Sequence, residues 1–155
     1  MKYNTLYSVA ESILDTVKAT GLFPEKSMGI AAISNTQQLL SVIDTFNVLP
    51  GAVVCIGECT FENDGLVRDK DIIIAVADSF KASTNAKAHG IWAIVDSVCA
   101  MFILKVEPGT VPQRCIINGV EFTLKGFTPI PSKSNIVAFA ITLSAVEAAS
   151  YEIEE

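Results

Sequence analysis

The chain has 155 residues, half of them hydrophobic and only 18% charged, and its formal net charge at neutral pH is −6. This length predicts one domain, residues 1–155, with a sizeable core. Clusters of Lys and Arg bind phosphate backbones, so an acidic chain without such a cluster is not expected to bind nucleic acid tightly. No run approaches the roughly 18 apolar residues of a membrane span, and residues 1–8 lack the apolar stretch of a signal peptide. We therefore expect no membrane contact and a cytoplasmic location.

The N-terminal third is predicted to contain two helices and a short strand. Apolar residues recur at helical spacing in Asn4–Thr20, where Asn4 or Thr5 can cap the start and a glycine follows the end. The short apolar segment Met28–Ile33 is predicted as a strand. A second helix is predicted over Gln37–Phe46, behind polar residues that can cap it.

The centre of the chain is predicted to form an antiparallel pair of strands. Ala52–Glu62 alternates between a drier and a wetter face. Asp69–Phe80 contains the continuous apolar run Ile72–Ala77, which is typical of a strand covered on both faces. The Asn-Asp-Gly sequence at Asn63–Gly65 is a turn signal between the two strands.

The C-terminal half is predicted to contain one helix, a tight hairpin and a last strand. Apolar residues at three- and four-residue spacing predict a helix over Ala86–Leu104. Asn118 and Gly119 both tolerate a positive φ angle, so they predict a two-residue type I′ turn. The Pro-rich segment Thr128–Lys133 is expected to be a rigid loop that leads into a strand over Ile136–Val146.

These elements predict an α+β fold with a mixed, mainly antiparallel sheet. The helices are expected to pack on one face of that sheet. Strands joined by short turns pair antiparallel, which accounts for both predicted hairpins.

The four cysteines are Cys55, Cys59, Cys99 and Cys115. Cys55 and Cys59 are spaced like a metal-binding or redox pair, but four residues of strand span about 13 Å. That separation is too long for a disulfide and awkward for a single metal ion. Together with the lack of a secretory signal, it predicts four reduced, mostly buried thiols that hold no metal.

No residue pattern predicts a catalytic, cofactor or metal site, and we expect the protein not to be an enzyme. His89, the single histidine, has no nucleophile motif beside it and is expected at the surface or at a helix N-terminus. The glycines form neither a dinucleotide-binding pattern nor a phosphate-binding loop. Trp92 is typical of a core residue, with a helix edge or an interface anchor as the alternatives.

One group of carboxylates lies around the predicted central turn. It can attract a cation, but it lacks the ligand spacing and the central glycine of a calcium loop. We therefore expect a solvated hairpin end. Its members are Glu62, Asp64, Asp69 and Asp71.

Four stretches of the chain resemble the small tail-terminator or tail-completion proteins of long-tailed phages, including the Mu-like prophage type. Val48–Val54 is similar to the segment that leads into the first strand of those proteins, and Asp69–Phe80 to their central strand. Gly126–Pro129 is similar to their loop before the last strand, and Val137–Val146 to that strand. The resemblance covers most of the chain in order and length.

The resemblance implies an α+β subunit that assembles into a ring, usually a hexamer, which caps the growing tail tube and joins it to the head. It implies no cofactor and no catalysis, with tail-tube and head-completion proteins as partners. Such a subunit is cytoplasmic during assembly and then part of the virion tail. The acidic charge agrees with a ring that lets DNA pass without binding it tightly.

Two other classes of protein stay open. One is a small-molecule-binding or regulatory α+β module of a bacterial protein, for which an apolar pocket with a few convergent polar groups would be the mark. The other is an enzyme that uses Asp or Cys residues, for which a perturbed carboxylate or thiolate in such a pocket would be required.

The last predicted strand also favours homo-oligomerisation. The chain carries no charged residue from Asn135 to Val146, and an uncovered strand edge of that kind invites uncontrolled pairing. The strand is therefore either covered by a neighbouring subunit or internal to its own sheet. The resemblance favours head-to-tail contacts that close into a ring.

The turn at Asn118 and Gly119 can be tested by the substitution Gly119→Val. A β-branched residue resists a positive φ angle, so we expect a loss of stability of about 1 kcal/mol or more. The measurement is thermal unfolding. An unchanged melting temperature would contradict the turn assignment.

Overall fold

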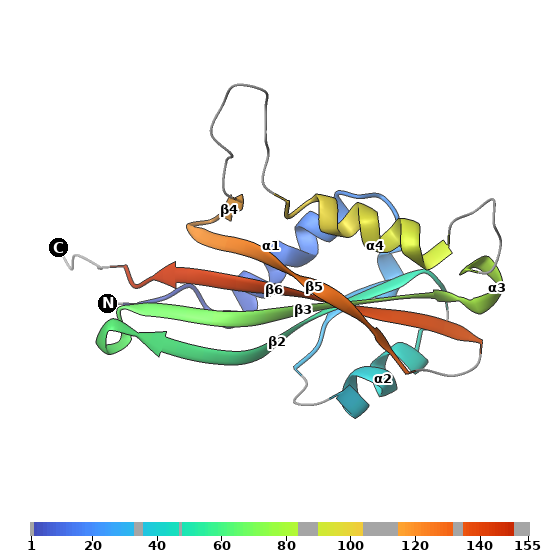
Figure 1. The fold of residues 1–155 in the computed structure, drawn as a ribbon, viewed down its shortest axis with the longest axis horizontal. Helices are drawn as coiled ribbons and strands as arrows, with labels where there is room; N and C mark the ends of the chain where they lie inside the picture. Colours follow the sequence, from blue (N-terminus) through green and yellow to red (C-terminus); the bar gives the residue numbers. More distant parts are fainter. Residues whose placement is uncertain are drawn as a thin grey trace, which may run out of the picture.

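The computed structural model describes residues 2–32, 36–46, 48–83, 90–103, 115–131 and 135–150. Within these residues, six strands form one sheet in the order β1-β2-β3-β6-β5-β4 (Figure 1). The β1–β2 pair is parallel, and the other neighbouring strands are antiparallel. The strands are β1 (Met28–Ile30), β2 (Gly51–Glu62), β3 (Val67–Ser79), β4 (Cys115–Ile117), β5 (Val120–Ile130) and β6 (Ile136–Ala148). This arrangement confirms the predicted α+β fold with a mainly antiparallel sheet.

The helices are α1 (Leu6–Lys18), α2 (Thr36–Asp44), α3 (Phe80–Ser83) and α4 (Gly90–Ala100). Helix α1 begins where predicted, because the Ser8 amide donates a 3.0 Å hydrogen bond to the Thr5 hydroxyl, which caps the helix. Helix α4 ends at Ala100, within the predicted range Ala86–Leu104. The first residues of that predicted helix, 86–89, and Leu104 lie outside the described residues.

The main core lies on the face of the sheet that carries Ile72 and Ile74, which we call the first face. Helices α1 and α4 cover it (Figure 1). Helix α1 lies against β1 and β2, and α4 lies against β3 and β6. A smaller cluster lies on the opposite, second face, where α2 places Leu39 and Ile43 against Ala75 and neighbouring residues. The sequence predicts that all helices pack on one face of the sheet. The structure differs from this prediction, because α1 and α4 share the first face and α2 lies on the second.

The position of α2 follows from the one parallel pair of strands. Parallel neighbours need a crossover connection, and a helix in that connection must lie on a face of the sheet. Helix α2 is the crossover between β1 and β2, and α1 already covers the first face beside them. The second face is therefore where α2 can bury its apolar side.

The two longest strands form the centre of the sheet. Every residue of β3 from Val67 to Ser79 is in register with a residue of β6, from Ala148 to Ile136. Strand β6 also pairs with β5 on its other side. The strand is thus internal, so an uncovered β6 edge does not supply an argument for oligomerisation.

Both predicted turns are found. Asn118 and Gly119 have φ angles of 50° and 78°, which confirms the tight hairpin between β4 and β5. Asn63 and Asp64 have positive φ angles in the short turn between β2 and β3. Positive φ is tolerated best by Gly, Asn and Asp, which are the residue types present.

One predicted loop is wrong in part. Thr128–Ile130 belongs to β5, and Pro129 is in register with Phe139 of β6. Strand β4 pairs with β5 only at its beginning, from Val120 to Phe122. Pro129 therefore lies on an edge strand, where a missing amide hydrogen removes no ladder bond to the outer side.

The short outer strands β1 and β4 cover only part of β2 and β5, and each of these two partly covered strands carries a β-bulge. Strand β1 covers β2 only from Ala52 to Val54, and β2 has a bulge between Ile56 and Cys59. Strand β5 has a bulge between Leu124 and Gly126. The outer half of β2 and the outer half of β5 have no strand partner within the described part of the chain.

The start of β2 offers a packing test. A Cβ atom at Gly51 would lie 2.6 Å from the ring of Phe46, whereas a Cβ atom at Gly29 in β1 would meet nothing within 4 Å. We expect Gly51→Ala to destabilise the fold by about 1–3 kcal/mol, the usual cost of overpacking. Gly29→Ala is the matched control and should be close to neutral in chemical denaturation. Equal effects of the two substitutions would argue against the close approach of Phe46.

Candidate functional site

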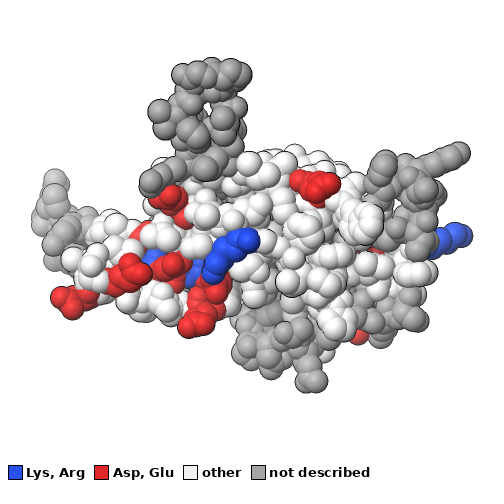
Figure 2. Space-filling model, in the orientation of Figure 1, with Lys and Arg blue, Asp and Glu red and all other residues white. Residues whose placement is uncertain are grey.

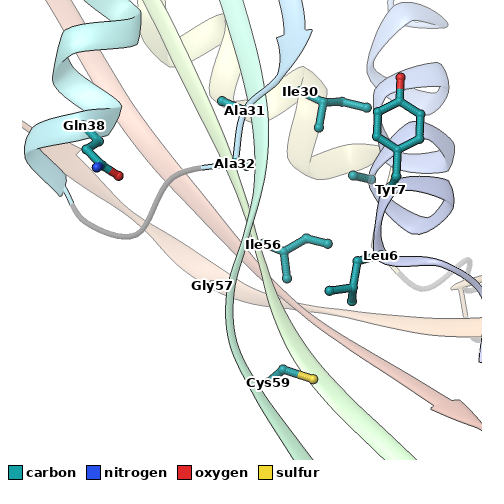
Figure 3. A pocket seen from close by; sticks show the side chains of 10 residues that line it. Leu6, Tyr7, Ile30, Ala31, Ala32, Gln38, Ile56, Gly57 and Cys59 are labelled. Carbon is teal, nitrogen blue, oxygen red and sulfur yellow. The ribbon is translucent and has the colours of Figure 1, made fainter.

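The candidate site is a pocket of about 560 Å³ at the edge of the sheet where β1 ends. Its walls are the first turns of α1, the end of β1 with the two residues that follow, and the middle of β2. Figure 3 shows the side chains of Leu6, Ile30 and Ile56 pointing into the space between α1 and β2. The lining is mainly apolar, with Tyr7, Gln38 and Cys59 as its polar side chains. An apolar pocket beside an open strand is suited to bind an apolar side chain or an extended segment.

The pocket exists because β1 is short. Strand β1 has three residues, and β2 continues far beyond it. The first face of β2 therefore stays uncovered next to α1, where Ile56 and Cys59 line the pocket. Leu6 and Tyr7 are among the exposed large hydrophobic residues of the protein.

A buried group of charged side chains fixes the chain just before α1. Lys70 is fully buried, and its Nζ atom lies 2.7 Å from Oε1 of Glu147. Arg68 donates to the same carboxylate and also, at 2.7 Å, to the carbonyl oxygen of Asn4. The Asn4 side chain in turn donates a 3.2 Å bond to Glu147. Residues 4 and 147 are thereby held together at the N-terminal end of α1.

Tyr3 adds a second attachment for the same segment. The Arg68 guanidinium lies 4.5 Å from the centre of the Tyr3 ring, a favourable cation–π geometry. The Tyr3 hydroxyl donates to the Gly65 carbonyl oxygen, and its ring packs edge-on against Phe61. Lys2 exchanges two backbone hydrogen bonds of 2.8 Å with Ser150. The N-terminal segment is thus pinned to the β2–β3 turn and to the residues after β6, and it sets the position of the pocket wall.

The charges in this group do not cancel. Two cations share one carboxylate, and the Nε atom of Arg68 is buried without a hydrogen-bond partner among the described residues. Burial raises the pKa of Glu147, but hydrogen bonds from Lys70 and Arg68 and their charges outweigh it, so its pKa lies below the usual value. Glu147 is therefore ionised at neutral pH and forms an ion pair with each of the two cations.

The acidic residues singled out in the sequence do not converge. Asp69 accepts a 2.9 Å bond from Ser144, and Asp71 pairs with Lys125 at 3.1 Å. Glu62 and Asp64 are exposed at the β2–β3 end of the molecule, where acidic side chains gather in Figure 2. In the described ranges, no group of three or more His, Cys, Asp or Glu side chains is placed to hold a metal ion.

The remaining sequence candidates are dispersed. His89 lies outside the described residues. Trp92 is 72% exposed rather than buried in the core, because it lies on the outer side of α4. With Val95, Asp96 and Phe127 it lines a second hollow of about 340 Å³. The interface-anchor alternative is the one that this exposure favours.

None of the four cysteines, all of which are described, forms a disulfide. Burial raises the pKa of Cys55 to about 11, and burial together with Asp96 raises the pKa of Cys99. A raised pKa keeps a thiol protonated and poorly nucleophilic at neutral pH. Cys59 and Cys115 are half-buried at opposite edges of the sheet.

Sequence reasoning missed both the pocket and the buried charges. A signal for the charges is present, because Arg68 and Lys70 alternate along the same strand as Ile72 and Ile74. Residues two apart share a face of a strand, so two cations on a core-facing row require a carboxylate nearby. The pocket has no such local signal, since it depends on how far β1 extends along β2.

No protein-family model matches the sequence, and no curated protein is found to be similar to it. In the part of the chain that the structure describes, every helix is too short or too polar to cross a membrane.

The buried charges predict an asymmetric response to substitution. Glu147→Gln leaves two buried cations without a counter-charge, so we expect a loss of about 3–5 kcal/mol. Lys70→Met leaves a neutral Arg68–Glu147 pair and should cost clearly less. Chemical denaturation at pH 7 measures both, and an equal loss in the two variants would contradict this account.

The same carboxylate makes stability depend on acid. Because the pKa of Glu147 is lowered by folding, its contribution is complete above the usual pKa of a glutamate. It is lost as the pH falls through the lower, folded value. Glu147→Gln should therefore remove part of the acid sensitivity, whereas the exposed Glu62→Gln should not. Denaturation midpoints between pH 7 and pH 3 provide the comparison.

Proposed function

We propose that this protein is a structural ring subunit of the tail-terminator or tail-completion type, acting at the head-proximal end of a phage or prophage tail tube. The observation that carries the proposal is the difference between the two edges of the sheet. One edge has an apolar pocket beside the open half of β2, and the other has exposed aromatic side chains beside the open half of β5.

Two different, apolar edges suit a head-to-tail contact. A contact between unlike surfaces is heterologous, and it produces a closed ring when the rotation between neighbours closes. Trp92 and Phe127 are 72% and 51% exposed, and large exposed aromatic residues are common anchors of protein interfaces. Strand β6 is paired on both sides and is not available for this contact.

The proposal includes the partners and location that the resemblance implies. The ring, with six subunits as the expected number, would contact the tail-tube protein on one side and head-completion proteins on the other. The subunit would be cytoplasmic during assembly and part of the virion tail afterwards. The net charge of −6 supports a ring that does not bind DNA tightly. The proposal involves no cofactor and no catalysis.

The pocket supports a second candidate, a small-molecule-binding or regulatory module. Its volume of about 560 Å³ lies within the usual range for ligand sites, about 300–1,000 Å³. Its polar side chains are few, which suits a mainly apolar ligand. A ligand retained during purification would add a fixed mass to the native protein.

Assembly on tail tubes distinguishes the two candidates. Tubes assembled from the tail-tube protein of the same phage or prophage are incubated with the purified chain and viewed by electron microscopy. We expect a ring at one end of each tube, with the subunit number given by native mass spectrometry. A chain that stays monomeric up to high micromolar concentration and also leaves the tubes uncapped would rule out the ring function.

A further inference from the structure

The two half-buried cysteines mark the ends of one row across the sheet. The register places Cys59 opposite Lys70, Lys70 opposite Ala145, Ala145 opposite Phe122, and Phe122 opposite Cys115. Phe122 and Ala145 belong to the first-face core, and Cys115 packs against it. Cys59 lines the pocket on the same face. The two thiols therefore lie on one face, at opposite edges, and at the same level along the strands.

A second row ends in two apolar residues. It runs through Ile30, Val54, Ile74, Ile141 and Phe127. Ile30 lines the pocket at the β1 edge, and Phe127 is exposed at the β5 edge, where it packs edge-on against Phe139. An aromatic residue such as Phe127 and a β-branched residue such as Ile30 form a favourable side-chain pair when they lie opposite each other on neighbouring strands.

Each row crosses five strands, but the two rows begin and end on different strands. The first row crosses the five strands β2, β3, β6, β5 and β4, and the second crosses the five strands β1, β2, β3, β6 and β5. Each edge of the sheet thus has a step, and the two steps are complementary. A second copy displaced by five strand spacings, about 24 Å, would bring β4 against the open half of β2 and the open half of β5 against β1.

From this complementarity we infer that copies of this chain join head to tail through their sheet edges, with Cys115 of one copy beside Cys59 of the next and Phe127 beside Ile30. The inference rests on the proposed ring function and names the surfaces that would form the ring. The paired ends lie four strand spacings apart within one copy, about 19 Å. They can therefore meet only between copies.

The pocket and the charges at the two edges agree with a second copy as the occupant. Ile30 lines the pocket, so an aromatic ring placed beside Ile30 on the first face enters the pocket. Glu58 lies in the β2 bulge and Lys125 in the β5 bulge, between the two rows. These two residues carry opposite charges and are both exposed. Lys125 also pairs with Asp71 of its own copy at 3.1 Å, but an ammonium group has three donors and can bind a second carboxylate, so the charges favour the approach of unlike edges.

Thiol cross-linking tests the predicted register. Adjacent strands lie about 4.8 Å apart, which is compatible with the Cα separation of a disulfide. Diamide takes two electrons and two protons from two thiols as the disulfide forms. We expect it to convert the assembled protein into a ladder of covalent oligomers that dithiothreitol reverses. Cys55 and Cys99 serve as internal controls, because burial raises their pKa and slows their reaction.

Single substitutions then identify the pair. Cys59→Ser and Cys115→Ser, each alone, should abolish the ladder. A mixture of the two variants should give covalent dimers and nothing longer, because each dimer retains one linked junction. Cross-linking that persists in Cys115→Ser would show contact between like edges and overturn the inference.

A second measurement does not depend on thiol chemistry. Phe127→Arg should raise the concentration needed for assembly at least about tenfold, as the loss of a buried aromatic anchor does. Leu66→Arg, which changes an exposed residue at the β2–β3 turn, should have no effect. Equal effects would contradict the predicted interface.

The outcomes separate this inference from the proposed function. Rings that form without a Cys59–Cys115 link overturn the predicted edges and leave the ring function intact. A specific link between copies that never close a ring supports the edges and argues against the ring function. A retained small molecule that adds mass to the native protein, together with absent cross-links, identifies a ligand as the occupant of the pocket and overturns the inference.

Discussion

The structure depends on the pairing of β3 with β6. These strands are paired in unbroken register over their whole length. Strand β2 lies on the outer side of β3 and β5 on the outer side of β6, so both central strands have a neighbour on each side. Ile72, Ile74 and Val76 point to the main core from one of them, and Ile73, Ala75 and Ala77 point to the smaller one. A strand that contributes to two cores cannot slip by one residue, because a slip would move each apolar set to the wrong face. The register of the outer strands, and the two edges, follow from this pair.

The buried charges occupy one end of the same pair. Lys70 and Arg68 continue the first-face row of β3, and Glu147 lies at the matching end of β6. Breaking such a group by removing one partner costs far more than the group contributes against an apolar equivalent. Its effect here is geometric, because the charged side chains attach the N-terminal segment to the sheet and so place α1 beside the pocket.

Much of the fold can be predicted from local patterns. The cap at Thr5, the turn at Asn118 and Gly119, and the apolar run of β3 each depend on residues close in sequence, and each is confirmed. The position of Pro129 in a strand and the placement of α2 on the second face depend on which strand lies next to which. The pocket and the buried charges involve residues far apart in the chain, such as Arg68 and Glu147, which are separated by 79 positions. Only the pairing of distant strands brings them together, so a single sequence did not predict them.

The two β-bulges affect how the protein behaves when it is alone. A β-bulge places two residues of one strand opposite one residue of its partner and so disrupts the regular spacing of the outward-facing N–H and C=O groups. An arbitrary extended peptide therefore cannot form backbone hydrogen bonds along the whole edge. Strands β2 and β5, which each have an open half, both carry one. At high concentration during synthesis, the bulges protect the open halves of β2 and β5 against amyloid-like stacking. In the proposed head-to-tail contact, the same irregular edges would accept only a partner whose outline has matching steps. Protection from aggregation and choice of partner would then arise from one feature of the backbone.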